Sequence, residues 1–338
     1  MFEKRFREMI IICSLFLLVT ILGSLCIGRY HLTTNEIFSF FAHMVIGAEY
    51  ITSDEFIGTV LLSVRIPRVA MAVLVGAALA TAGVTSQGLF CNPLVSPHIL
   101  GVSAGAGFGA AIGILFFNGQ LAIQAMALLW GLIAVEITIL LSKVSKKGQM
   151  YVLVLAGVIV TALFNAFLSL LKYTADTETA LPSIVFWLMG SLAGSSYEKL
   201  SVAAPLILAG ILIMYLQRWK LNIMSLSEEE ALSLCRNIRL HKKIAIFAST
   251  MATAAAISTC GIIGWVGLVI PHVGRMLVGT DHRRLLPVGI LLGGIYMLII
   301  DDIARTLTTV EIPLSVLTAI IGAPFFAYLL GKTGGRWS

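Results

Sequence analysis

The sequence contains a stretch with almost no charged residues that is too long for a soluble domain. Between Val69 and Ser142, the only Asp, Glu, Lys or Arg is Glu136. A soluble domain has a core of limited size and a surface that must be wetted, so it cannot hide so long an apolar stretch. Of all 338 residues, 12% are charged and 58% are hydrophobic. We therefore expect an all-α polytopic membrane protein in a lipid bilayer.

Cysteine is also scarce, and the spacing of the cysteines does not suit a disulfide framework or a metal site. The five cysteines are widely scattered, and none of them forms a C-x-x-C pair. Neither a disulfide framework nor a zinc site is indicated. We expect no catalytic residue, no metal and no cofactor. The roles of His98 and His272, which neighbour prolines, stay open between structural hydrogen bonding, metal ligation and proton transfer.

Two glycine patterns imitate nucleotide sites but lack the required context. Residues 105–110 match a dinucleotide fingerprint, yet they lie in an apolar helical stretch with no preceding strand. Residues 331–333 read Gly-Lys-Thr, but Phe326 stands where a phosphate-binding loop needs its first glycine. The chain is expected to bind no nucleotide of its own. The net charge of +6 indicates membrane topology rather than nucleic acid.

Helix breakers and charges divide the chain into ten expected spans. About 20 residues, at about 1.5 Å each, cross about 30 Å of hydrocarbon. The segment 174–197 is expected to be an external loop with a short interfacial helix. The whole chain, 1–338, is treated as a single transmembrane domain. The expected spans are 9–28, 61–87, 99–117, a fourth that ends at 142, 150–171, 200–217, 244–263, 266–278, 285–300 and 312–330.

The distribution of basic residues sets the expected orientation. Ten spans place both termini on one side of the membrane. The termini and loops of that side hold 16 Lys and Arg, whereas the opposite loops hold six. Because basic residues accumulate in cytoplasmic loops, both termini are expected to lie in the cytoplasm. The expected location of the protein is the inner membrane of the cell.

Three features of the sequence are candidates for function, each with a plainer interpretation. Four glycines spaced by four residues, from Gly101 to Gly113, either permit close helix packing or line a pathway. Three arginines near outer span ends, Arg65, Arg68 and Arg305, either anchor helices at lipid headgroups or receive carboxylates of an incoming protein. The acidic segment 226–234, with the pattern of a capping box, is either a solvated loop or a docking helix.

Several motifs, taken in order, resemble one family of transporters. The resemblance is to the permease subunit of iron-chelate, haem and cobalamin ABC importers, the type II importers, and it covers nearly the whole chain. The motifs are R-I-P-R at 65–68, N-P-L at 92–94, I-L-G-V-S-A-G-A at 99–106, G-L-V-I-P-H at 267–272, D-H-R at 281–283 and G-A-P-F at 322–325.

The resemblance implies an assembly and assigns roles to residues. It implies a homodimer of ten-helix subunits, two cytoplasmic ABC ATPase subunits and an extracytoplasmic solute-binding protein. The arginines Arg65, Arg68 and Arg305 would meet acids of the binding protein. The segment 222–240 would couple to the ATPase through Ser227, Glu228, Glu229, Glu230, Ala231, Leu234 and Arg236. The candidate residues for the pathway or its packing are Gln87, Asn92, Pro93, Gly101, Ser103, Gly105 and Gly109.

Two departures from the family pattern affect the coupling segment. Ser227 stands where the family favours glycine, and Cys235 stands where a glycine often follows leucine.

The function expected from this resemblance is transport without catalysis. The chain would form the path for an iron siderophore or haem, while a partner hydrolyses ATP. Cobalamin and oxyanions such as molybdate or tungstate remain alternatives within the same class. An ion-coupled secondary transporter is a different class, and Glu136 is its main support. An intramembrane enzyme would need paired acids or a metal cluster deep in a span, which the sequence does not offer.

Overall fold

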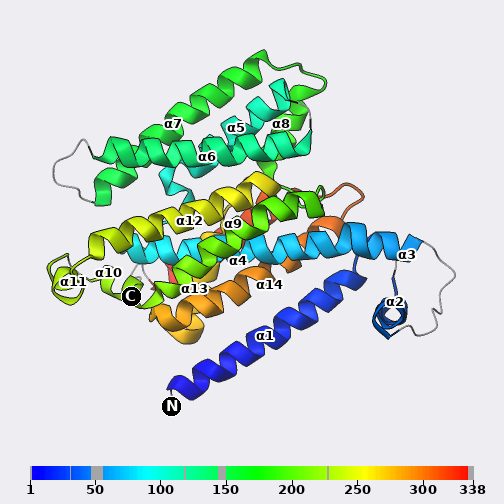
Figure 1. Cartoon of the computed structure of the whole chain (residues 1–338), viewed down its shortest axis with the longest axis horizontal. Coiled ribbons are helices and arrows are strands. Elements are labelled where there is room, and N and C mark those ends of the chain that lie inside the picture. Colours follow the sequence, from blue (N-terminus) through cyan, green and yellow to red (C-terminus); the bar gives the residue numbers. More distant parts are fainter. Residues whose placement is uncertain are drawn as a thin grey trace.

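The structure is a computed structural model that describes residues 2–30, 32–46, 56–117, 119–143, 150–226 and 228–333. Every regular element within these ranges is a helix, as expected for an all-α membrane protein. Figure 1 shows the longer helices running side by side in stacked layers, with α5, α6 and α7 at one side and α1 at the other.

Seven helical segments are long and apolar enough to cross a membrane. They are α1 (Phe2–Cys26), α4 (Ile66–Phe90, continuous with α3 at Phe56–Thr59 and the π-helix η1 at Val60–Arg65), α6 (Gln120–Ser142), α7 (Met150–Thr174), α9 (Tyr197–Leu216), α12 (Ile238–Cys260) and α14 (His282–Thr306).

Shorter apolar helices occupy the remaining expected spans. The helices α5 (Val102–Phe116), α13 (Val266–Val278) and α15 (Leu314–Thr333) fall at the expected third, eighth and tenth spans. The helix α8 (Ala180–Met189) is the short helix expected between residues 174 and 197. The count of ten spans stays a prediction, because only the seven segments above are long and apolar enough to cross a membrane among the described residues.

Three small helices and a turn complete the described part of the chain. They are α2 (Thr34–Ile46), α10 (Arg218–Met224), α11 (Glu228–Leu234) and the 3₁₀ turn η2 (Pro97–Leu100). The sequence analysis missed α2 and α10. The signal for α2 was present, since Thr33 and Glu36 form a capping box: Thr33 N donates to Glu36 Oε2 at 2.7 Å, and Glu36 N donates to Thr33 Oγ1 at 3.3 Å.

Glycines allow α4 to lie at the centre of the bundle in direct backbone contact with its neighbours. A Cβ atom on Gly76 would lie 2.1 Å from the carbonyl oxygen of Gly293 in α14. A Cβ atom on Gly83 would lie 2.1 Å from the carbonyl oxygen of Gly267 in α13. Helices in a bilayer gain little from the hydrophobic effect between them, so such close approach supplies the packing energy.

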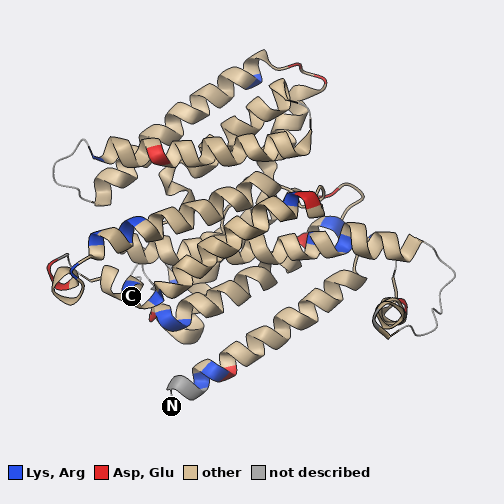
Figure 2. Ribbon diagram, viewed as in Figure 1, with Lys and Arg blue, Asp and Glu red and all other residues tan. Residues whose placement is uncertain are grey.

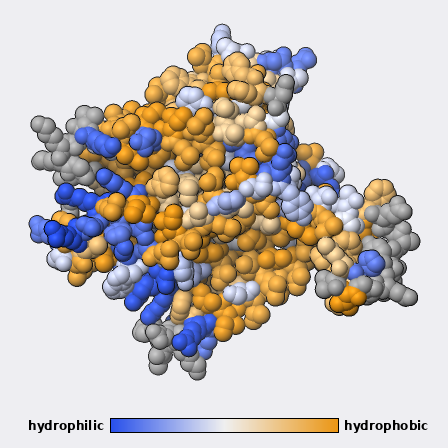
Figure 3. Space-filling model, in the orientation of Figure 1, coloured by the Kyte–Doolittle hydropathy of each residue, from blue (hydrophilic) through white to orange (hydrophobic). Residues whose placement is uncertain are grey.

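Charge divides the molecule into two ends and an apolar middle. In Figure 2 the Lys, Arg, Asp and Glu residues gather toward the two ends of the bundle, and in Figure 3 hydrophobic residues cover most of the surface between them. We call the end near both chain termini and α11 the terminal end. We call the other, where η1 and the end of α14 meet, the arginine end. This distribution is the one expected of a protein embedded in hydrocarbon.

Candidate functional site

The arginine end contains a buried network of charges. Arg68, in the first turn of α4, donates from Nε and Nη2 to Asp301 of α14, at 2.9 and 2.8 Å. Its Nη1 and Nη2 also donate to the two carboxylate oxygens of Glu311, each at 2.9 Å. Arg68 is 6% exposed and Asp301 is fully buried. One guanidinium therefore joins α4, α14 and the segment between α14 and α15.

Glu311 is held ionised by this contact. Burial alone would raise the pKa of its carboxyl group, but hydrogen bonds and the charge of Arg68, followed by Arg29 and Arg305, bring that pKa below its usual value. Arg68 consequently faces two carboxylates, and the bidentate geometry is the strong form of such a pair.

The other two arginines of the network tie α1 to the rest of the bundle. Arg65 donates to the carbonyl oxygens of Leu25, Cys26 and Tyr30, at and just after the end of α1. Arg305 donates to the carbonyl oxygen of Ser24 at 2.7 Å and to Asp302. Cations at the last carbonyls of a helix also complement its dipole.

The structure gives each of these three arginines partners within the chain. Arg65, Arg68 and Arg305 are 3%, 6% and 6% exposed. Arg68 and Arg305 pair with acids, whereas Arg65 donates to backbone carbonyl oxygens at the end of α1. A sequence without tertiary contacts cannot reveal that arrangement. Docking of a binding protein at this end stays a prediction that no contact here tests.

A cavity at the terminal end brings together residues that lie far apart in the sequence. Its volume is about 600 Å³. The predicted pathway residues Gln87, Asn92 and Pro93 line it, at and after the end of α4. Opposite them are His272 and Arg275 of α13. The sequence analysis gave Arg275 no role.

The glycines of α5 serve helix packing. A Cβ atom on Gly105 would lie 2.4 Å from the carbonyl oxygen of Trp130, and one on Gly109 would lie 2.2 Å from that of Met126, both in α6. Gly101 adopts a φ of +85°, which a residue with a side chain rarely adopts. Next to this turn, the Oγ atom of Ser103 shares a hydrogen bond with Nδ1 of His98.

The predicted coupling residues within the described part of the chain lie on α11 or, for Arg236, just after it, at the terminal end. Glu229, Glu230, Leu234 and Arg236 are exposed, whereas Ala231 is buried. Ser227, the predicted cap, lies outside the described residues, and so does the side chain of Glu228. The exposed face is acidic at its start and is followed by bases. The sequence predicted a helix here, and one is present.

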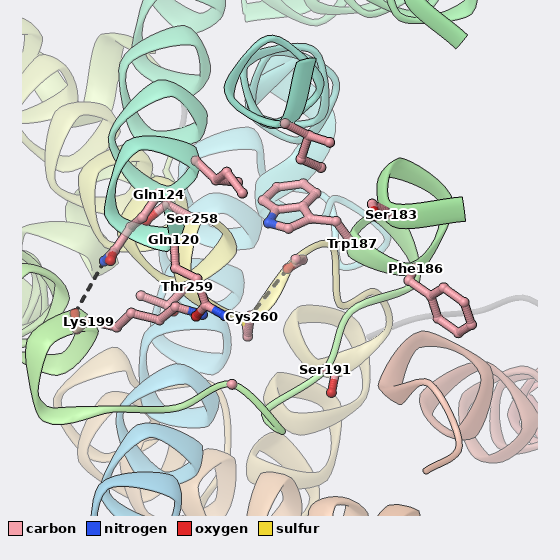
Figure 4. A pocket seen from close by; sticks show the side chains of 14 residues that line it. Gln120, Gln124, Ser183, Phe186, Trp187, Ser191, Lys199, Ser258, Thr259 and Cys260 are labelled. Atoms are coloured by element: carbon pink, nitrogen blue, oxygen red, sulfur yellow. Dashed lines mark hydrogen bonds between the residues drawn. The ribbon is translucent and has the colours of Figure 1, made fainter. Parts of the chain in front are cut away.

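A second cavity lies toward the arginine end between α5, α6, α8, α9 and α12. Its volume is about 270 Å³. Figure 4 shows Lys199 of α9 and Gln120 of α6 extending into it, close to Thr259 and Cys260 at the end of α12. Gln124 Nε2 donates to the carbonyl oxygen of Lys199 at 3.2 Å. The sequence analysis counted Lys199 only as a charge on the outer side.

Comparisons with known proteins match this architecture. The model of the FecCD transport family matches residues 16–332. The chain belongs to the FecCD transport family. It is an ABC importer permease, a multi-pass membrane protein that forms the transport subunit of its system.

Several relatives extend over nearly the whole chain. The molybdate import system permease protein MolB of Haemophilus influenzae is 42% identical, with 94% of each chain covered. The hemin transport system permease protein HmuU of Yersinia pestis is 38% identical, over 80% of this chain and 82% of that protein. A solved structure described as an inward-facing conformation of a metal-chelate type ABC transporter has a TM-score of 0.87 and 41% identity, over 96% of this chain and 99% of that one.

Proposed function

We propose that this chain forms, with a second copy of itself, the membrane path of an ATP-driven importer for a metal-containing anion. The observation that carries the proposal is the 42% identity to a molybdate permease over 94% of both chains, next to 38% identity to a haemin permease. Molybdate is an anion, and haem and carboxylate-bearing iron chelates also carry anionic oxygens. Molybdate, an alternative in the sequence analysis, thereby becomes as strong a candidate as an iron siderophore or haem.

The orientation and partners belong to the same proposal. The terminal end faces the cytoplasm, because it carries the basic loops. Two ABC ATPase subunits bind there and contact α11. A solute-binding protein delivers the cargo at the arginine end, where the buried network fixes the shape of the surface rather than supplying free charges. ATP is hydrolysed by the partner subunits, and this chain supplies no catalytic residue.

Charge reversal on α11 tests the coupling role. We expect the double variant Glu229→Lys, Glu230→Lys to reduce ATP-dependent uptake at least about tenfold, which corresponds to about 1.4 kcal/mol of interaction, because two repulsive charges would face the ATPase. Uptake and co-purification of the ATPase are measured in proteoliposomes. The control is Glu198→Lys, an exposed acid in the first turn of α9. Normal uptake by the double variant would refute the coupling role.

A further inference from the structure

The cavity at the terminal end holds a positive charge that has no partner in the described part of the chain. Arg275 forms no ion pair there, and its Nη2 atom is buried without a hydrogen-bond partner. The side chain as a whole is partly buried, so part of its charge is removed from water without a compensating ion pair, which costs free energy. Native proteins keep such a group for a reason, which is commonly a ligand or a second conformational state.

The acid nearest in the cavity lining is already engaged. Asp281 accepts from Nη2 of Arg283 at 2.7 Å and from Nδ2 of Asn222 at 2.7 Å. Its hydrogen bonds with Arg283 hold the pKa of this carboxyl far below its usual range. Asp281 therefore remains ionised, and the charge that neutralises it is Arg283 rather than Arg275.

A second unpartnered polar atom lines the same cavity. Gln87 is 4% exposed, its Nε2 donates to the carbonyl oxygen of Gly267 at 3.2 Å, and its Oε1 has no partner. The cavity thus offers a guanidinium for an anionic oxygen and an amide oxygen for a hydroxyl group or a bound water. His272 packs edge-on against Phe325 of α15, with ring centroids 6.1 Å apart, and closes one wall.

We infer that this cavity is an anion site through which the cargo leaves, with Arg275 as its recognition residue. The ligand is the cargo's own anionic oxygen, either of an inorganic oxoanion or of a carboxylate on a metal chelate, since guanidinium groups bind both in a bidentate manner. Asn92 and Pro93, which follow α4, complete the lining of the site. This inference rests on the proposed function, because it takes the terminal end as the exit.

The test measures binding and transport separately. The complex of this chain with its ATPases is placed in nanodiscs without nucleotide or binding protein, and molybdate and citrate are titrated as probes by equilibrium dialysis. We expect at least one probe to bind, Arg275→Gln to weaken that binding at least tenfold, and Arg275→Lys to restore part of it. Lys243→Gln is the control, because it removes an exposed cation of α12 at the same end that lines neither this cavity nor the adjoining one.

The outcomes distinguish this inference from the proposed function. Equal binding by the wild type and Arg275→Gln, or no binding of either probe, overturns the inference even when ATP-driven uptake is normal. Loss of the ATPases from Arg275→Gln also overturns it, because the guanidinium would then serve the subunit interface. If Arg275→Gln fails to fold, Gln87→Leu replaces it, and unchanged binding by that variant contradicts the site. Wild-type binding without ATP-dependent uptake would refute the transport proposal alone.

Discussion

Replacing Arg68 with alanine is expected to destabilise the protein by about 3–5 kcal/mol, the usual cost of removing one partner from a buried ion pair. The change would leave Asp301 fully buried without its hydrogen-bonded partner, and the one ion pair left to it in the described part of the chain is the longer contact with Arg305 Nε at 3.8 Å. The free energy of unfolding is measured by titrating folded protein in mixed micelles with a denaturing detergent. Since α4 and α14 are joined here, the effect should reach the whole bundle.

Two further variants show whether the loss comes from the uncompensated charge. Glu311→Gln should lower the free energy of unfolding by less than Arg68→Ala does. The Glu311 side chain is 26% exposed, so water can solvate the part of the Arg68 guanidinium that loses its partner. The double variant Arg68→Met, Asp301→Leu removes both charges of the Arg68–Asp301 pair. It should recover much of the stability lost in Arg68→Ala, because replacing a buried ion pair with hydrophobic residues is often neutral or stabilising. An Arg68→Ala protein within about 0.5 kcal/mol of the wild type, the range of ordinary surface changes, would contradict a structural role for the network.

Adding one methyl group to Gly76 should have an effect of similar size. Its Cβ would meet the Gly293 carbonyl oxygen at 2.1 Å and Met297 Cγ at 2.7 Å. The backbone of α14 cannot rotate away as a side chain would, so α4 and α14 must separate. Overpacking of this kind costs about 1–3 kcal/mol or more. We expect Gly76→Ala to lie at the upper end of that range in the same unfolding assay.

A matched glycine in α14 should respond in the opposite direction. A Cβ on Gly289 would lie 3.4 Å from Cγ2 of Val84, which is ordinary contact. Alanine is favoured over glycine in helices by about 1 kcal/mol, so Gly289→Ala should be neutral or stabilising. If both alanine variants changed stability equally, close backbone contact would not be what holds α4 in place.

The coupling helix and the exit cavity differ in how far the sequence could anticipate them. The acidic helix at 228–234 could be predicted from its capping box and its charge pattern, because the residues that form these signals lie close together in the sequence. The cavity did not follow, because Gln87 and Arg275 are separated by most of the chain and meet only when α4 packs on α13. The helix α2 was missed for a different reason, since its capping box between Thr33 and Glu36 was there to be found.

The amino-acid sequence was enough to show that this is a helical membrane protein, where its long spans lie and which family it resembles. Those properties depend on hydrophobicity along the chain and on short ordered motifs, which need no knowledge of contacts. Only the tertiary structure decided which charges are paired. The roles of Arg68 and Arg305 were open until the structure showed Asp301 and Asp302 paired with them. Arg275 had no role until the structure showed its Nη2 atom buried without a partner. The energy of a charge depends on its neighbours in space, and those are set by packing.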